Sequence, residues 1–327
     1  MAIYILSDDG HKVLANGMAG TEAGQSLGIH TPVRIASNTK TFTAATVLRL
    51  WETGRVDLDA PIAALVAPEL DRLLRSDGYD PDRITVRQLL SHSAGLFDHA
   101  SDPRFAETFM ADPGRVWTPS DLLGLMTEYG DPRSVPGIEF SYSDDGYILL
   151  GNIIERITGK SLASAVREEL GFSRIGVLDT WWEILEEPPA GVVPRTRQWI
   201  GNREVTNVHA SVDLFGGGGL LMSARDMAIF WKALFEGKIF AQPGTLDEML
   251  RQGSHKGSDR YRLGMFAEQF NGRTFYWHSG FWGTYALYDP ATRTAVAGVT
   301  TQQLAFRDLV AIARRQVQGL ESQGTEH

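Results

Sequence analysis

The sequence predicts an α+β fold, with a mainly antiparallel sheet flanked by helices and a largely helical second domain. Strand-like runs lie near both ends of the chain, and segments of helical period fill the middle. After the glycine run at 216–219 the pattern returns to short strands. The 327 residues, 43% of them hydrophobic and 22% charged, are enough for a sizeable core. One sheet built from both ends of the chain is therefore expected.

This order of elements also predicts the domain boundaries. We expect residues 1–34 and 206–327 to form an α/β sheet domain. Residues 35–205 are expected to form the largely helical domain inserted between its two halves. An active site would then lie in the cleft between the domains.

The first expected elements are a hairpin and a helix. Residues 2–7 and 12–16 are predicted strands around the turn sequence DDGH. A helix is predicted for 37–53, because its pattern is helical and Gly54 suits the position after a helix end.

The middle of the chain is expected to alternate helices with loops. The prolines between Pro103 and Pro136 predict a loop-rich region, and those at 188, 189 and 194 predict loops or edges within 176–215. Helices are expected in the segments 86–96, where a short helix is followed by a loop, 120–129, 146–159 and 161–171.

The last third is expected to hold most of the sheet. A helix should begin at Ser223, where Asp226 three residues later completes a capping-box pattern. Another helix is expected at 306–317. Strands of an antiparallel meander are expected at 261–269, 274–278, 283–289 and 293–300.

Composition excludes several classes of function. The net charge is −9 and no basic run occurs, so nucleic acid is not an expected partner. The chain has no Cys, its eight His show no metal-ligand spacing, and neither a metal nor a cofactor is expected. No apolar run approaches the roughly 20 residues of a membrane helix. The start of the chain does not read as a signal peptide, which predicts either a cytoplasmic location or a protein whose leader has been removed.

The segment RIASNTKTF, residues 34–42, carries the sharpest chemical pattern. Ser37 is the only Ser with Lys three residues later, at Lys40, so a helix would place both side chains on one face. A Ser at a helix N-terminus suits an oxyanion, and a Lys in a dry pocket is expected to have a lowered pKa and to take the Ser proton. The alternative is an N-cap Ser beside a surface Lys. Rival signatures such as G-x-S-x-G, H-E-x-x-H and a Walker loop are absent.

Two further segments allow a structural and a functional interpretation. SYSDD, residues 141–145, either caps the following helix or brings Tyr142 and Asp144 to an active site. In FYWHSGFWGT, residues 275–284, Gly280 marks either a bulge or the close approach of another group. For the run GGGG at 216–219, close backbone packing or a flexible turn is the favoured interpretation.

Taken together, these motifs resemble those of the penicillin-recognising serine enzymes. That family includes class C β-lactamases, DD-peptidases, D-aminopeptidases and amidases, and β-lactamase-like esterases. The resemblance rests on Ser37-x-x-Lys40, Tyr142-Ser143-Asp144 and His278-Ser279-Gly280, in the family's order. The connecting segments LLSHSAGL, GYILLGNIIERITGKS and GGGGLLMSARDMAIFWKAL also look like those of the family, so the likeness covers nearly the whole chain.

The resemblance implies a role for each catalytic residue. Ser37 would be the nucleophile that forms an acyl-enzyme, Lys40 would ease its deprotonation, and Tyr142 would pass the proton to the leaving group. The backbone N–H groups of Ser37 and Phe281 would form the oxyanion hole. The residues expected to contact substrate are Asp144, His278, Gly280, Phe281 and Trp282.

Three departures from the family pattern matter. Asp144 stands where the family usually has Asn, and an ionised carboxylate only accepts hydrogen bonds. It would hold Lys40 as an ammonium or attract a cationic substrate group. His278 stands where many β-lactamases have Lys, which weakens binding of a substrate carboxylate. A helix before the first strand, which the resemblance implies, is not found, so part of the sheet would be open or covered by the C-terminal helix or a partner.

Three functions are compatible with this reading. The first is a serine hydrolase that acts through an acyl-enzyme on a small ester, amide or short peptide, as an esterase, a D-amino-acid amidase or peptidase, or a weak β-lactamase. The second is an acyltransferase on the same scaffold. The third is a non-catalytic ligand-binding homologue, which the intact Ser37, Lys40 and Tyr142 argue against.

Overall fold

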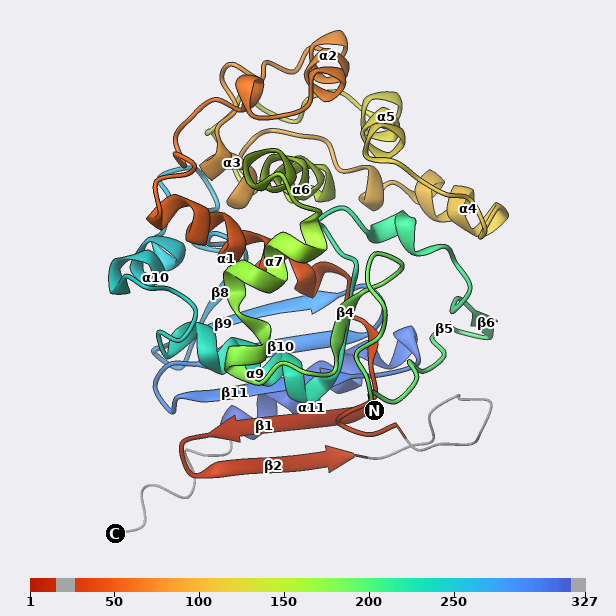
Figure 1. Ribbon diagram of the computed structural model, residues 1–327, viewed down its shortest axis with the longest axis vertical. Helices are drawn as coiled ribbons and strands as arrows, with labels where there is room; N and C mark the ends of the chain where they lie inside the picture. The colour runs from red at the N-terminus through yellow and green to blue at the C-terminus, as the bar shows by residue number, and fades with distance from the viewer. Residues whose placement is uncertain (16–26, 319–327) are drawn as a thin grey trace.

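A six-stranded sheet forms one side of the protein. The computed structural model describes residues 1–15 and 27–318, and the sheet lies in the lower half of Figure 1 with strand order β2-β1-β11-β10-β9-β8. Every neighbouring pair of strands is antiparallel. The strands are β1 Ala2–Ser7, β2 Gly10–Ala15, β8 Phe266–Phe270, β9 Arg273–Gly280, β10 Thr284–Asp289 and β11 Thr294–Val299.

The register confirms that both ends of the chain build this sheet. Strand β1 pairs with β11, with Ala2 opposite Val299. Alternate residues of β1 face opposite sides, so Ile3 and Ile5 belong to one core cluster and Tyr4 to the other. Helix α11 (Phe306–Gln318) covers the first face and α9 (Ala224–Phe235) the second. The C-terminal helix thus covers one face of the sheet, which was one of the expected alternatives.

Helices on the far side of α9 complete the α+β fold (Figure 1). The expected helices are confirmed within a few residues at each end, and α6 ends at Gly159, which adopts φ 67°. The helices not yet placed are α1 Thr39–Glu52, α2 Pro68–Ser76, α3 Val86–Leu90, α4 Pro103–Ala111, α5 Pro119–Tyr129, α6 Asp144–Thr158, α7 Leu162–Leu170, α8 Phe172–Ile175 and α10 Pro243–Leu250.

Four of these helices, α2, α4, α8 and α10, were not expected. Three of them begin with a proline, at Pro68, Pro103 and Pro243. Proline at the first helical position loses no hydrogen bond and has a suitable φ, so it starts a helix as readily as it interrupts one. The prediction of loops around Pro103 is wrong for this reason.

The strand predicted at 261–269 is also wrong at its start. Strand β8 begins only at Phe266, because Gly264 turns the chain with φ 96°. A Cβ on Gly264 would lie 2.3 Å from the Cβ of Ala44, so the turn packs directly on helix α1. The predicted strand at 12–16 is β2, which begins earlier, at Gly10; residue 16 lies outside the described residues.

Small sheets connect the large sheet to the helices. Strands β3 (Val33–Arg34), β7 (Leu220–Met222) and β4 (Thr180–Trp182) pair in the order β3-β7-β4. Strands β5 (Trp199–Ile200) and β6 (Arg203–Glu204) form a separate pair.

No helix in the described parts of the chain is long and apolar enough to span a membrane. The domain boundaries at residues 34 and 206 stay predictions.

Candidate active site

Ser37 lies on a tight turn between β3 and α1. The segment Ala36–Asn38 is a 3₁₀ turn, and the α-helix begins at Thr39, two residues later than expected. Ala36 has φ 46°, a left-handed conformation that costs energy for a residue with a Cβ. Such strain is often found at functional sites, and here it immediately precedes the serine.

Lys40 is completely buried and reaches three groups. Its Nζ lies 2.9 Å from Ser37 Oγ, 2.8 Å from the carbonyl oxygen of Gly217 and 2.6 Å from Asp144 Oδ1. Close packing of the glycine run makes the second contact possible, because a Cβ on Gly216 would lie 2.5 Å from the carbonyl oxygen of Tyr147. The interpretation of this run as a close-packing segment is confirmed.

The protonation of Lys40 differs from the first expectation. Burial alone would lower the pKa of the Lys40 ammonium, but the Asp144 carboxylate, with smaller effects of Tyr142 and Asp213, raises this pKa above its usual value. The prediction of a lowered pKa is therefore wrong. The expectation that Asp144 would hold Lys40 as an ammonium agrees with their ion pair.

Tyr142 lies beside the Ser37–Lys40 pair. Burial of its phenol raises the pKa of Tyr142, while Lys40 and a hydrogen bond to Ser37 oppose this rise. The Lys40 Nζ lies 5.2 Å from the ring centroid of Tyr142. On its other side the ring packs against His92 at a centroid distance of 4.1 Å. His92 Nδ1 also accepts a hydrogen bond from the Ser143 N–H, so this buried histidine fixes the segment that carries Tyr142.

The end of strand β9 lies against the turn that carries Ser37. A Cβ on Gly280 would come within 2.0 Å of the carbonyl oxygen of Ile35, so only glycine allows this approach. The expected close approach at Gly280 is confirmed. It brings the next residue, Phe281, into the wall of the cavity that Ser37 lines. Gly280 itself is not among the lining residues of that cavity, and its contact with substrate stays a prediction.

His278 is a supporting residue. Its side chain is buried and absent from the cavity wall, and its contact with substrate stays a prediction. The Ser279 N–H donates to Nδ1 at 2.9 Å, and Nε2 lies 3.1 Å from the Tyr261 hydroxyl. Burial, with a smaller effect of Lys40, lowers the pKa of His278 to about 3, so the ring is neutral.

The candidate active site is a cavity of about 230 Å³ in front of Ser37. Tyr142, Asp144, Phe281 and Trp282 line it as the sequence predicted. Helix α4, which was not expected, contributes two aromatic rings. The remaining lining residues are Ala36, Asp98, Ala100, Ser101, Phe105, Ala106, Phe109, Val212 and Asp213.

The sequence analysis did not predict two carboxyl groups of this wall, those of Asp98 and Asp213. Burial raises the pKa of each to about 7, and the nearby Asp144 carboxylate adds to both shifts. Asp98 lies on the loop before the short helix His99–Ser101, and Asp213 ends a 3₁₀ turn. Neither has a spacing relation to Ser37, so no sequence pattern indicates them.

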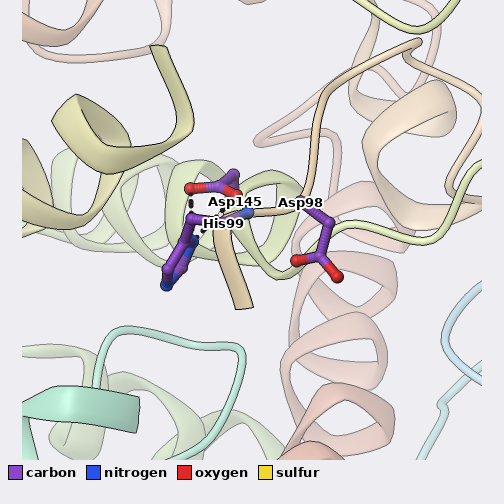
Figure 2. A group of neighbouring side chains, drawn as sticks. All are labelled: Asp98, His99 and Asp145. Atoms are coloured by element: carbon purple, nitrogen blue, oxygen red, sulfur yellow. Dashed lines mark hydrogen bonds and ion pairs between the residues drawn. The ribbon is translucent and has the colours of Figure 1, made fainter. Parts of the chain in front are cut away.

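A buried ion pair holds the loop of Asp98 in place. His99 Nδ1 lies 2.9 Å from both carboxylate oxygens of Asp145, and its backbone N–H donates to Oδ2 (Figure 2). Asp98, His99 and Asp145 are close enough to hold a metal ion. Since Asp145 already accepts the His99 proton, and the Asp98 carboxylate accepts the Asp144 N–H, the contacts match an ion pair better than a metal site.

This pair predicts a pH-dependent contribution to stability. Burial alone would lower the pKa of His99, but Asp145 raises it to about 9, above the unfolded value near 6.5. The folded state therefore gains free energy that is complete below about pH 6.5 and is lost as the pH rises through about 9, a contribution of about 3 kcal/mol. The free energy of unfolding, measured with urea at several pH values, should fall between about pH 6.5 and 9. We expect His99→Gln to remove this part of the pH dependence. The exposed His30, changed to Gln, is the control; an equal slope in His99→Gln and wild type would contradict the prediction.

Comparison with known proteins agrees with this geometry. The family model described as Beta-lactamase matches residues 2–320. The chain belongs to the beta-lactamase family. The crystal structure of a D-stereospecific amidohydrolase from Streptomyces aligns with a TM-score of 0.77 and 23% identity, covering 92% of this chain and 89% of that one. This similarity confirms the β-lactamase-like α+β fold.

Curated relatives of the family carry different activities in their names. Monacolin J acid methylbutanoyltransferase of Aspergillus terreus is 28% identical over 69% of this chain and 58% of its own length. Esterase EstB of Burkholderia gladioli is 32% identical over 55% of this chain and 45% of its own length. This chain thus matches about half the length of each. The family includes hydrolases and acyltransferases of this fold.

Proposed function

We propose that this protein is a serine hydrolase that acts through an acyl-enzyme on an ester or amide. The observation that carries the proposal is the contact of Lys40 Nζ with Ser37 Oγ at 2.9 Å, beside Tyr142 and at the wall of a cavity. A nucleophile, a fixed positive charge and a proton relay are then within reach of one bound carbonyl group.

The protonation states support a relay through Tyr142. Ser37 Oγ attacks the carbonyl carbon and its proton moves to the Tyr142 oxygen, while the phenol proton moves to the leaving group. Lys40, held as an ammonium by Asp144, stabilises the negative charge that develops on Ser37. The N–H groups of Ser37 and Phe281 would bind the oxyanion. Water then attacks the acyl-enzyme, and the reverse proton path frees Ser37.

The charge of the cavity supports a substrate with a cationic group, such as a free amine. Asp98, Asp144 and Asp213 line the wall, no Lys or Arg is among its described lining residues, and the nearby Lys40 is already paired with Asp144. A bound ammonium would compensate Asp98 and Asp213, whose burial is otherwise costly. Aromatic rings of Phe105 and Trp282 in the same wall also favour a cation.

The proposal is tested by covalent labelling. A fluorophosphonate is expected to add to one serine, and peptide mass mapping should locate the adduct on Ser37. A panel of 4-nitrophenyl esters, D-amino-acid amides and a chromogenic β-lactam then defines the acyl group. The proposal fails when Ser37 is not labelled and no member of the panel is turned over.

The variant Tyr142→Phe separates a role of Tyr142 in proton transfer from a role in substrate binding. Removing the hydroxyl takes away the proton path but keeps the ring that packs on His92. We expect kcat for an amide to fall about 10²-fold, within the range for general acid–base groups, and KM to change less than threefold. Equal effects on kcat and KM would show a structural role instead. An ester with a good leaving group, which needs less protonation, should lose less.

The preference of the enzyme for a cationic over an uncharged substrate is predicted to depend on pH. Asp98 and Asp213 ionise near pH 7, so the ratio of kcat/KM for an ester with a quaternary ammonium group to that for its uncharged isostere should rise as the pH increases through 7. Asp98→Asn is expected to lower this ratio about tenfold at pH 8. The control is Asp102→Asn, on a carboxylate that pairs with Arg104 outside the cavity wall. A ratio that is independent of pH and of Asp98 would exclude a cationic substrate but not the hydrolase.

Acyl transfer is the second candidate, favoured by the similarity to the methylbutanoyltransferase. The first half of the reaction would be the same, and an alcohol or amine would replace water in the second. Product analysis with and without an added acceptor distinguishes the two: a transferase forms the acylated acceptor in preference to the free acid.

A further inference from the structure

A second cavity, of about 250 Å³, lies between helix α3 and the chain that connects α10 to β8. Tyr261, Arg262, His255 and Arg87 are part of its wall. No residue of this wall also lines the cavity in front of Ser37. The proposed hydrolase activity therefore does not explain the presence of this second cavity.

Arg262 is the unusual residue of this wall. It is 7% exposed, and no carboxylate in the described parts of the chain forms an ion pair with it. A buried cation without an ion-pair partner is costly, and burial lowers the pKa of this guanidinium, although Tyr276 and the exposed Asp259 carboxylate oppose part of the shift. An arginine in such a place is retained at the expense of stability, unless something else supplies the negative charge.

The hydrogen bonds of Arg262 leave one edge of its guanidinium unused. Nη1 donates to the carbonyl oxygens of Ser258 and Tyr261. Nη2 has only a 3.5 Å contact with Gln252 Oε1, and Nε has no partner. Nε and Nη2 form the side of the fork that binds two oxygens of a carboxylate or phosphate at once.

The other arginines of the wall are already neutralised. Arg87 pairs with both oxygens of Asp59, at 2.6 and 2.8 Å, and with Glu248. Arg251 pairs with Glu248 at 2.8 Å. Among the arginines of this wall, the one without a carboxylate in an ion pair within the described parts of the chain is Arg262.

A second polar group of the same wall also lacks a partner. The Nε2 atom of His255 is buried and makes no hydrogen bond. Burial lowers the pKa of this ring, so it is neutral at pH 7 and can carry a proton on Nε2. Arg262 and His255 thus offer unused donors to one cavity. Both nitrogens are enclosed, so direct contact with a ligand requires these side chains to move.

We propose that this cavity binds a small oxyanion, a carboxylate or a phosphate, through the Nε–Nη2 edge of Arg262. The anion supplies the ion-pair partner that Arg262 lacks in the described parts of the chain and accepts the unused hydrogen bonds. The site is separate from the catalytic cavity. Tyr261 lies between the two, because it lines the anion cavity while its hydroxyl contacts His278 behind the catalytic residues.

Calorimetric titration of the full chain with inorganic phosphate and with acetate tests the site, at a constant ionic strength set with chloride. We expect one saturable site per chain, and the two arms show whether a tetrahedral or a planar anion is preferred. Arg262→Gln should weaken binding at least tenfold. Arg262→Lys, which keeps the charge but not the fork, should weaken it at least threefold. Arg115→Gln, an equal change of charge outside the cavity, should have no effect.

The same titration can overturn the proposal. Absence of saturable binding of either anion, or equal affinity in folded Arg262→Lys and wild type, would do so. Phosphate is expected to leave the KM of a 4-nitrophenyl ester unchanged, because the cavities are separate; competitive inhibition would place the anion at the catalytic site instead. These outcomes do not depend on whether Ser37 forms an acyl-enzyme, since the labelling of Ser37 is measured independently.

Discussion

Ser37→Ala is expected to lower kcat/KM for an activated ester by at least about 10³-fold. The hydroxyl is the only group of the serine that can form the acyl bond, and its oxygen lies 2.9 Å from Lys40 Nζ. Without it, the oxyanion donors and the cavity can only orient water. The measurement is the steady-state rate of the most rapidly hydrolysed ester of the panel.

Ser101→Ala is the matched control for this change. Ser101 lines the same cavity, and its hydroxyl donates to the carbonyl oxygen of Asp98 instead of contacting Lys40. We expect it to change kcat/KM less than fivefold. Since Ser37 is partly exposed, its alanine variant should unfold within about 1 kcal/mol of wild type. Retention of activity in a folded Ser37→Ala protein would exclude the acyl-enzyme mechanism.

The catalytic residues were predictable because their spacing and order are properties of the chain itself. A separation of three residues brings Ser37 and Lys40 to one face of a helical turn whatever the rest of the fold does. Tyr142 could be added only through the order of motifs in related enzymes. The fold class followed in the same way, because strands at both ends of the chain have few arrangements other than a shared antiparallel sheet.

The electrostatics of the site could not be predicted from spacing. Whether Lys40 has a raised or a lowered pKa depends on the 2.6 Å approach of Asp144, and that distance is set by how α6 packs against α1. Asp98 and Asp213 reach the cavity from loops, where no periodicity links sequence position to direction. His278 is the reverse case: its motif was recognised, but strand β9 turns the side chain toward Tyr261 and away from the cavity.

The largest effect after loss of the nucleophile is expected for Lys40→Met. Methionine fills a similar volume without charge, so the proton relay through Tyr142 loses the ammonium that stabilises its charged states. We expect kcat to fall about 10²- to 10⁴-fold with a smaller change in KM. Labelling of Ser37 by a fluorophosphonate should slow by a comparable factor, because the serine is no longer activated.

Asp144 makes it possible to separate the catalytic and the structural roles of Lys40. Lys40→Met leaves the Asp144 carboxylate without its partner, and loss of one member of a buried pair costs about 3 kcal/mol of unfolding free energy. In the double variant Lys40→Met/Asp144→Asn the unpaired charge is gone, so most of this stability should return while activity stays low. Recovery of activity together with stability would mean that Lys40 acts only by holding Asp144. Recovery of stability alone assigns the ammonium to the reaction, and urea unfolding measured beside ester hydrolysis decides between these outcomes.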